Sequence, residues 1–184
     1  MIAMTIDPAV AALIVSCTAL LFATAAIHKL RDLRRFEEIF AAYGLFPVPA
    51  RWRLARAVPA LEALVAAGLL LDEARKAAAC VGIALLLTYA AAIGVNLSRG
   101  RRDLACGCGG PDDRRPIAPW MVWRNIFIAA LSALIVMVPW SSRVLVPTDL
   151  VTIGCGTAAC ALVYLCLDRL LGRTARLSAQ LRMT

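Results

Sequence analysis

Two cysteines flank a single glycine in the stretch ACGCGGPDD, which occupies residues 105–113. Cys106 and Cys108 lie among glycines, which permit the tight turns and positive φ angles that bring neighbouring thiols together. A disulfide between residues i and i+2 reaches the required Cα separation only with strain, and strained disulfides have the high reduction potentials of labile or catalytic ones. The spacing therefore predicts a thiol–disulfide redox pair.

Basic residues near the motif favour the reactive form of a thiol. Positive charge lowers the pKa of a thiol, and the thiolate is the nucleophile in disulfide exchange. Cys106 and Cys108 are therefore the candidate catalytic residues. The basic residues concerned are Arg101, Arg102, Arg114, Arg115 and, from the end of the first apolar segment, His28.

Metal binding is the rival chemistry for the two thiols. A closed zinc site needs four ligands, the C-G-C motif supplies two, and His28 offers a third. No second C-x-C or C-x-x-C motif completes the set, so the sequence favours redox chemistry and predicts no metal site. A glycine-rich turn with two unreactive cysteines is the remaining interpretation.

The other five cysteines lie in apolar segments, where a cysteine usually packs as a small hydrophobic residue. We expect them to be inert, and a five-residue spacing on a helix points Cys155 and Cys160 about 140° apart. These five residues are Cys17, Cys80, Cys155, Cys160 and Cys166.

The composition is that of a membrane protein. The 184 residues are 61% hydrophobic, with mean hydropathy +0.77 and a net charge of +8. A protein with this positive charge binds either nucleic acid or anionic lipid. Its apolar runs of about twenty residues favour a lipid membrane over nucleic acid. No basic residue precedes the first apolar run, so we expect no removable signal peptide and one membrane domain over residues 1–184.

Five apolar segments are predicted to cross the membrane as helices, because a backbone in lipid must satisfy its own hydrogen bonds. The second is short for a hydrocarbon core about 30 Å thick, unless Arg53 and Arg56 extend their side chains to the headgroups. Proline opens the first and fourth segments, where its fixed φ suits the first helical turn. The predicted spans are residues 8–27, 57–71, 77–97, 119–138 and 148–171.

An amphipathic helix is predicted over residues 32–43, between the first two spans. Its charged residues lie largely off an apolar stripe, and Gly44 with the prolines that follow ends it. We expect this helix to lie flat on the membrane surface, with an ordinary soluble helix packed on a neighbour as the alternative. The apolar stripe consists of Leu33, Phe36, Ile39, Phe40 and Tyr43.

Alternating the spans across the bilayer brings polar residues from several helices to one side. Ionisable residues inside spans cost about 2–3 kcal/mol each on an insertion scale, and they usually mark a functional site. Glu62 and Arg124 form a natural ion pair at this depth. Snorkelling side chains, boundary hydrogen bonds and a helix cap by Asn96 are the non-functional alternatives. The expected supporting residues are His28, Lys29, Glu62, Asn96, Arg124 and Asn125.

The chain resembles the MauE branch of the DoxX-like, redox-associated membrane proteins. The resemblance covers about residues 10–138 and rests on HKLRDLRRFEEIFAAYGLFP, VPALEALVAAGLLL, NLSRGRRDLACGCGG and WRN. It implies an all-α integral membrane protein, with a DoxX-like four-helix transmembrane bundle, a fifth transmembrane helix and the interfacial helix. Relatives usually read Asp-Cys-Gly-Cys-Phe-Gly, whereas Ala105 and Gly109 stand here in place of the acid and the aromatic residue.

The resemblance also implies a role in maturing methylamine dehydrogenase, a periplasmic enzyme whose small subunit carries many disulfides and a tryptophan-derived quinone. The implied partners are the thioredoxin-like protein MauD and that small subunit, and the implied location is the bacterial inner (cytoplasmic) membrane. Cys106 and Cys108 would exchange disulfides with one of these partners.

A quinone is the candidate cofactor, because the chain is similar in arrangement to quinone-linked membrane thiol oxidoreductases. No quinone site can be read from the sequence. The alternative function is a non-catalytic membrane scaffold or chaperone for the same maturation pathway.

The charge distribution opposes a periplasmic site. Sixteen Lys and Arg residues fall on the predicted side of Cys106 and three on the other, with the in-span Arg124 left out. The positive-inside rule then places the motif in the reducing cytoplasm. Three interpretations would reconcile the charge distribution with the implied role. The motif could act as a reductant in the cytoplasm, the basic residues could form a docking surface that overrides the rule, or the short second span could be assigned wrongly.

Overall fold

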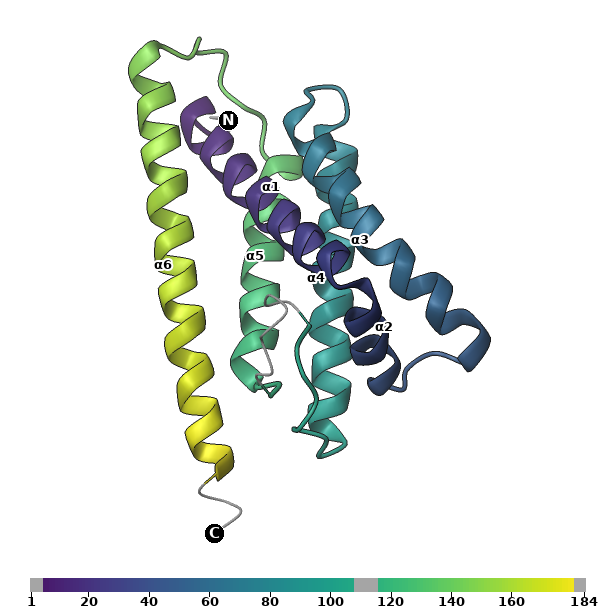
Figure 1. Ribbon diagram of the computed structural model, residues 1–184. Coiled ribbons are helices and arrows are strands. Elements are labelled where there is room, and N and C mark those ends of the chain that lie inside the picture. Colours follow the sequence, from purple (N-terminus) through teal and green to yellow (C-terminus); the bar gives the residue numbers. More distant parts are fainter. Residues whose placement is uncertain (1–4, 108–115, 181–184) are drawn as a thin grey trace.

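The fold is all-helical in the computed structural model, which describes residues 5–107 and 116–180, with side chains up to residue 171. Cys108 lies outside the described residues. The long helices run back and forth, and α2 is a short helix at one end (Figure 1). In chain order the helices are α1 (Pro8–Arg31), α2 (Leu33–Ala42), α3 (Val48–Leu70), α4 (Arg75–Ser98), α5 (Pro119–Met137) and α6 (Pro147–Gln180).

Local sequence signals set where several helices begin and end. The Asp7 carboxylate accepts the Ala9 N–H at 2.8 Å, which caps α1 just before Pro8. Helix α2 is followed by Gly44 at φ +65°, a conformation that glycine adopts without a Cβ clash. The predicted amphipathic helix 32–43 is therefore confirmed as a helix.

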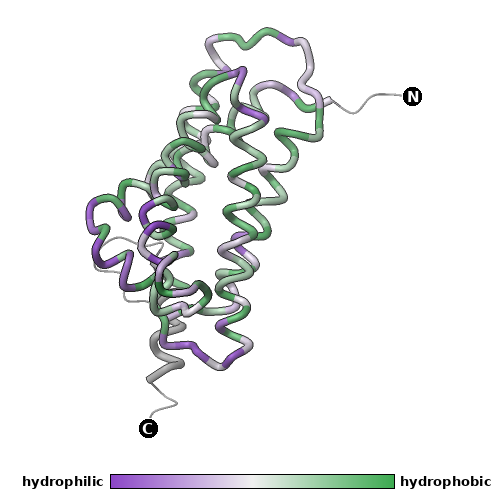
Figure 2. Tube along the Cα trace, turned by 90° about the vertical axis from the view of Figure 1, so that its right-hand side faces the viewer, coloured by the Kyte–Doolittle hydropathy of each residue, from purple (hydrophilic) through white to green (hydrophobic). Residues whose placement is uncertain are grey.

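Four helices are long and apolar enough to cross a membrane: α1, α4, α5 and α6. They match the predicted spans at 8–27, 77–97, 119–138 and 148–171. Hydrophobic residues follow the long helices in Figure 2, and hydrophilic residues gather mostly towards their ends.

The predicted second span, 57–71, differs from the structure. It forms the second part of α3, which begins at Val48 and carries Arg51, Arg53 and Arg56 in its first part. These charges keep α3 out of the set of apolar candidate spans. The periodic apolar pattern gave no sign of this early start, because the first turns of α3 contain Pro49 and exposed arginines.

The two ends of the bundle carry different connections. At one end, the Ile6 N–H donates to the Pro139 carbonyl at 3.0 Å and so joins the N-terminus to the α5–α6 connection. At the other end, Arg101 after α4 donates to the Ala42 carbonyl at the end of α2 at 2.6 Å. Figure 1 shows the α3–α4 turn at the first end, so the ends group as the alternating spans predict.

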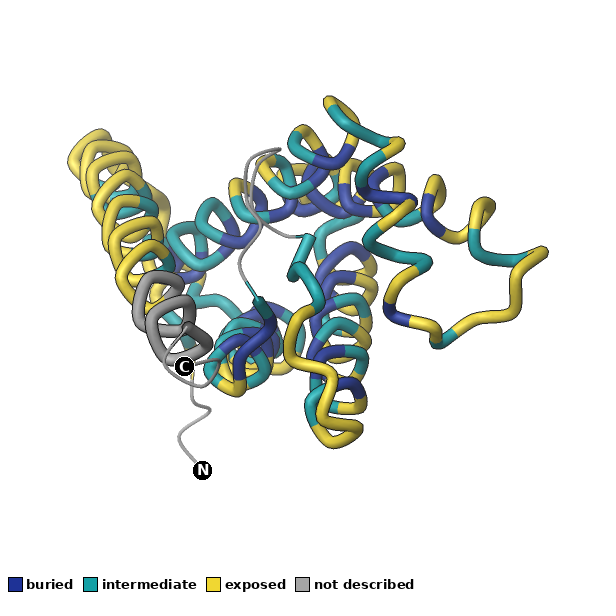
Figure 3. Tube along the Cα trace, turned by 60° about the horizontal axis from the view of Figure 1, so that its bottom comes forward, coloured by how far each residue is buried: buried dark blue, intermediate teal, exposed yellow. Residues whose placement is uncertain are grey.

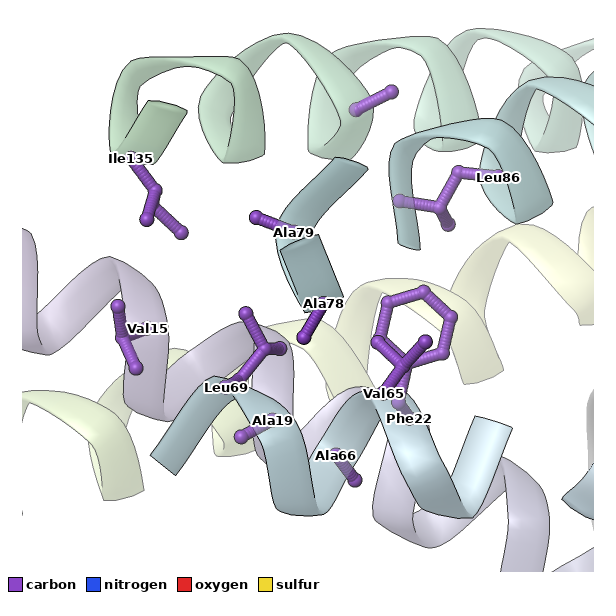
Figure 4. Close-up of a cluster of buried hydrophobic side chains, with 11 residues drawn as sticks. Val15, Ala19, Phe22, Val65, Ala66, Leu69, Ala78, Ala79, Leu86 and Ile135 are labelled. Atoms are coloured by element: carbon purple, nitrogen blue, oxygen red, sulfur yellow. The ribbon is translucent and has the colours of Figure 1, made fainter. Parts of the chain in front are cut away.

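Small residues allow α1, α3, α4 and α5 to approach closely. An added Cβ at Gly82 of α4 would lie 3.0 Å from the Phe22 ring of α1. Close approach of this kind is how helices gain packing energy in a membrane, where lipid offers no hydrophobic drive for association. Figure 4 shows this core cluster: Val15, Ala19, Phe22, Val65, Ala66, Leu69, Ala78, Ala79, Leu86, Ala129 and Ile135.

Helix α6 stands apart from this core. It packs along α1, where Gly156 lets the Leu13 side chain approach, and none of its described side chains is buried. In Figure 3 α6 is coloured mostly as exposed, while the buried residues gather among the other helices. Because α6 packs loosely against the other helices, a cavity remains between α1, α5 and α6.

Candidate functional site

A cavity of about 1010 Å³ lies between α1, α5 and α6, with contributions from α3, α4 and the loop before α5. Most of its wall is apolar, and polar side chains gather where α1 ends and α5 begins. Six of the eight residues predicted for the site line this cavity: His28, Lys29, Glu62, Cys106, Arg124 and Asn125.

Lys29 and Glu62 form a buried ion pair at this polar end, with side chains only 4% and 1% exposed. The Tyr89 hydroxyl donates to the same Glu62 oxygen at 2.8 Å. The Lys29 ammonium also lies 5.1 Å from the centre of the Phe36 ring, close enough for a cation–π contact. A buried ion pair is tolerated when further contacts of this kind compensate its loss of water.

Arg124 pairs with Asp168 of α6, and their nearest nitrogen and oxygen lie 3.0 Å apart. The guanidinium also lies over the Trp120 ring at 5.2 Å and the Tyr164 ring at 5.7 Å. The predicted pairing of Glu62 with Arg124 is therefore wrong. Glu62 pairs instead with Lys29 at the end of α1, and Arg124 pairs with Asp168 of α6.

Several polar atoms at this end lack a hydrogen-bond partner among the described residues. They include Oε2 of Glu62 and Nδ2 of Asn125, on side chains 1% and 3% exposed. His28 Nδ1 is another such atom on a half-buried side chain. Buried polar groups are nearly always hydrogen-bonded, so atoms of this kind need an explanation. All three residues line the cavity, although these atoms themselves are buried.

Cys106 reaches the cavity through a loop that folds back onto α2. The Ile117 N–H donates to the Leu104 carbonyl at 2.9 Å and closes the loop at its base. Gly107 has φ +72°, and a Cβ there would lie 3.2 Å from the Ile39 side chain of α2. The glycine of the C-G-C motif is thus required for the loop to pass close to the amphipathic helix.

Asn96 does not line the cavity. It is 0% exposed, donates to the Ala92 carbonyl at 3.0 Å and accepts from Arg101 at 3.0 Å. Arg101 in turn donates to the carbonyls of Ala42 and Tyr43. Asn96 therefore orients an arginine that fastens the end of α4 to the end of α2, a role close to the helix-end alternative of the sequence analysis.

Sequence reasoning missed Tyr89 and Asp168, although each gave a signal. Tyr89 is a polar aromatic residue two turns before Asn96 in an apolar span, and Asp168 is an acid inside the fifth span. No His, Cys, Asp or Glu cluster suited to a metal ion occurs in the ranges that the structure describes.

Two cysteines expected to be inert meet between α1 and α6. The thiols of Cys17 and Cys160 are neighbours, and both residues line the cavity. Cys80, Cys155 and Cys166 are exposed on the outer surface of their helices and lie outside the cavity lining.

Comparison with known proteins identifies a family and several relatives. The family model of methylamine utilisation protein MauE matches residues 7–138. Methylamine utilization protein MauE of Methylophilus methylotrophus is 33% identical over 90% of this chain and 88% of its own length. The protein of the same name from Paracoccus denitrificans is 37% identical over 62% of this chain and 61% of its own length, which is less than two thirds. No solved structure matches the chain.

Proposed function

Because the chain belongs to the family of methylamine utilisation protein MauE, we propose that it is a membrane thiol–disulfide redox factor. In this role it forms disulfides in the small subunit of methylamine dehydrogenase, or helps to process or stabilise that subunit. The thioredoxin-like protein MauD and that small subunit are its partners. The location that goes with these partners is the bacterial inner membrane.

The observation that carries this proposal is the position of Cys106. It lies at the polar end of the cavity together with Lys29, Arg124 and His28. A thiol in positively charged surroundings that a partner can reach is the kind that exchanges disulfides, whereas a structural cysteine is usually buried in apolar surroundings. Cys106 is half-buried on a loop near these basic side chains, of which Lys29 and Arg124 are paired with carboxylates, so it combines polar surroundings with access.

The exchange reaction balances without further reagents. A thiolate of the partner attacks the Cys106–Cys108 disulfide and forms a mixed disulfide, and one motif thiolate leaves. A second partner thiol then attacks the mixed disulfide, which releases the motif as a dithiol and leaves the partner with one new S–S bond. Two electrons pass from the partner to the motif in each cycle.

The membrane arrangement that goes with this function is DoxX-like. In it α1, α3, α4 and α5 form the four-helix bundle, α6 is the fifth transmembrane helix, and α2 lies in the interface. The charged first part of α3 would then lie among the headgroups beside α2, where the Arg56 side chain already pairs with Glu37 at 2.6 Å.

The redox role predicts that both thiols of the motif are required. We expect Cys106→Ser or Cys108→Ser to abolish assembly of disulfide-bonded methylamine dehydrogenase small subunit in a host that produces both proteins. The measurement is the amount of oxidised small subunit on a non-reducing gel. Cys80→Ser is the matched control, because Cys80 lies on an exposed helix face, and it should leave assembly normal.

Two further readings sharpen this experiment. Single serine variants should trap a mixed disulfide with MauD or the small subunit, since the resolving thiol is missing. A membrane-impermeant maleimide, applied with and without reductant, reports the side of the membrane and the redox state together. Normal assembly in the double serine variant would reject the redox role and leave a non-catalytic scaffold.

A further inference from the structure

The cavity has the form of a site for a lipid-soluble molecule with a polar head. Leu20, Phe127 and Leu165 line it and yet remain 41%, 64% and 50% exposed, so the cavity opens onto the apolar surface of the candidate spans. Its volume of about 1010 Å³ lies at the upper end of the range for small-molecule pockets, roughly 300–1,000 Å³. A ring with part of an isoprenoid tail is a molecule of that size.

The polar end favours a neutral head that both accepts and donates hydrogen bonds. Lys29 and Arg124 at the polar end are each paired with a carboxylate, and the third arginine or lysine of the lining, Arg169 of α6, is exposed. Among the described residues, the polar end therefore offers no unpaired buried Lys or Arg to an anionic phosphate head. The unpartnered Asn125 Nδ2 is a donor, and the unpartnered Glu62 Oε2 is an acceptor. A quinone carbonyl accepts from an amide N–H, and a quinol hydroxyl donates to a carboxylate.

We propose that this cavity binds a membrane quinone, and that the quinone is the electron acceptor that reoxidises the C-G-C motif. This inference rests on the proposed redox function. Cys106 lines the cavity at the same end as Asn125 and Glu62, so the reacting sulfur and the quinone head share one compartment. An acyl chain of an ordinary lipid would fill the apolar wall but would leave both polar atoms unpartnered.

The electron balance of the step is complete. The Cys106 and Cys108 thiols lose two electrons and two protons and form one S–S bond. The quinone takes up the two electrons and two protons and leaves as quinol. The glutamate is the positioned acceptor for a quinol hydroxyl, and the asparagine amide holds the quinone carbonyl; both are binding residues in this scheme.

Photolabelling tests the binding site independently of turnover. The full-length protein is placed in nanodiscs of synthetic phosphatidylcholine and exposed to an azido-substituted short-chain ubiquinone under light. We expect labelled peptides from α5 and α6, and competition by unlabelled decylubiquinone. Asn125→Leu should weaken labelling about tenfold, roughly the effect of one lost hydrogen bond.

A matched pair of cavity variants provides the control. Ala161→Trp places a large side chain in the cavity wall and should reduce labelling at least about tenfold, because the ring and the indole compete for one space. Ala159→Trp makes the same change on an exposed face of α6 outside the cavity lining, and labelling should persist. Labelling that is not competed, or that survives equally in both variants, overturns the quinone site and indicates bound acyl chains only.

Anaerobic mixing of the reduced protein with decylubiquinone tests the electron transfer. Two thiols should disappear for each quinol formed, and Cys106→Ser should stop quinol formation while it preserves photolabelling. If labelling is absent but the serine variants still block assembly, the quinone inference fails and the thiol–disulfide function stands with another acceptor. If labelling and quinol formation occur but the double serine variant assembles the dehydrogenase normally, the quinone site stands and the maturation role fails.

Discussion

At the residue scale, Glu62 shows how a charge is kept inside a helical bundle. Its carboxylate receives the Lys29 ammonium and the Tyr89 hydroxyl on one oxygen, and its second oxygen is buried without a hydrogen-bond partner among the described residues. The charge is therefore compensated by contacts from two other helices. The ion pair joins α1 to α3 inside the bundle.

Breaking the Lys29–Glu62 pair should be strongly destabilising. Glu62→Leu leaves the Lys29 ammonium buried without its carboxylate, and the loss of one partner of a buried pair typically costs about 3–5 kcal/mol. The measurement is the free energy of unfolding by SDS titration in mixed micelles. The double variant Lys29→Met/Glu62→Leu should recover most of the loss, because it removes both charges. A double variant as unstable as the single one would contradict this account of the pair.

At the element scale, α6 packs along α1 and is joined to α5 by an ion pair. Arg124 of α5 pairs with Asp168, Gly156 admits Leu13 of α1, and the Cys17 thiol is a neighbour of the Cys160 thiol. None of the described side chains of α6 is buried, and a large cavity lies between α6, α1 and α5. The position of α6 relative to α1 and α5 therefore sets the volume of the cavity that forms the candidate site.

The contact between α1 and α6 can be captured chemically. We expect a membrane-permeant oxidant such as copper phenanthroline to cross-link Cys17 to Cys160, because these thiols are neighbours. Mass spectrometry of the digested, unreduced protein measures the linked peptides. Cys160→Ala should abolish the link and Cys155→Ala should leave it intact, since Cys155 lies outside the cavity lining that holds Cys17 and Cys160. A link from Cys17 to Cys155 instead would mean that α6 is rotated from the position described.

At the scale of the whole molecule, Arg143 connects the N-terminal segment, the α5–α6 connection and the start of α6. These segments lie at the end of the bundle opposite the C-G-C motif. Arg143 in the α5–α6 connection contacts Asp7 before α1 at 3.0 Å and Asp149 in the first turn of α6 at 2.8 Å. Its hydrogen bond, together with the Ala9 N–H, lowers the pKa of Asp7 below its ordinary value. The contacts are solvent-exposed, so their effect on stability is modest.

This arrangement predicts a dependence of stability on pH in the acid range. A carboxyl group with a lowered pKa in the folded protein stabilises it above the ordinary aspartate pKa of about 3.9, and that contribution is lost as pH falls through the lower folded value. The thermal midpoint of the wild type should therefore exceed that of Asp7→Asn at pH 6, and the difference should shrink towards pH 3. A difference that stays constant over this range would show that Arg143 does not stabilise the charged form of Asp7.

The sequence by itself determined the membrane character and predicted the chemistry. Apolar runs of span length indicate helices whatever their neighbours, because a backbone in lipid has no other way to satisfy its hydrogen bonds. The alternation of spans placed His28, Lys29 and Arg124 at one end, and the spacing of Cys106 and Cys108 predicts a redox pair.

Only the tertiary structure decided which of these groups meet. Helical periodicity fixes the face on which a side chain lies, but partners depend on the rotation and crossing of each helix, which a single segment does not encode. For that reason Glu62 pairs with Lys29 and not with Arg124, and Asn96 secures Arg101 outside the cavity. The cavity could not be predicted from the sequence of any single helix, because it lies between α6, α1 and α5 and depends on how these helices pack.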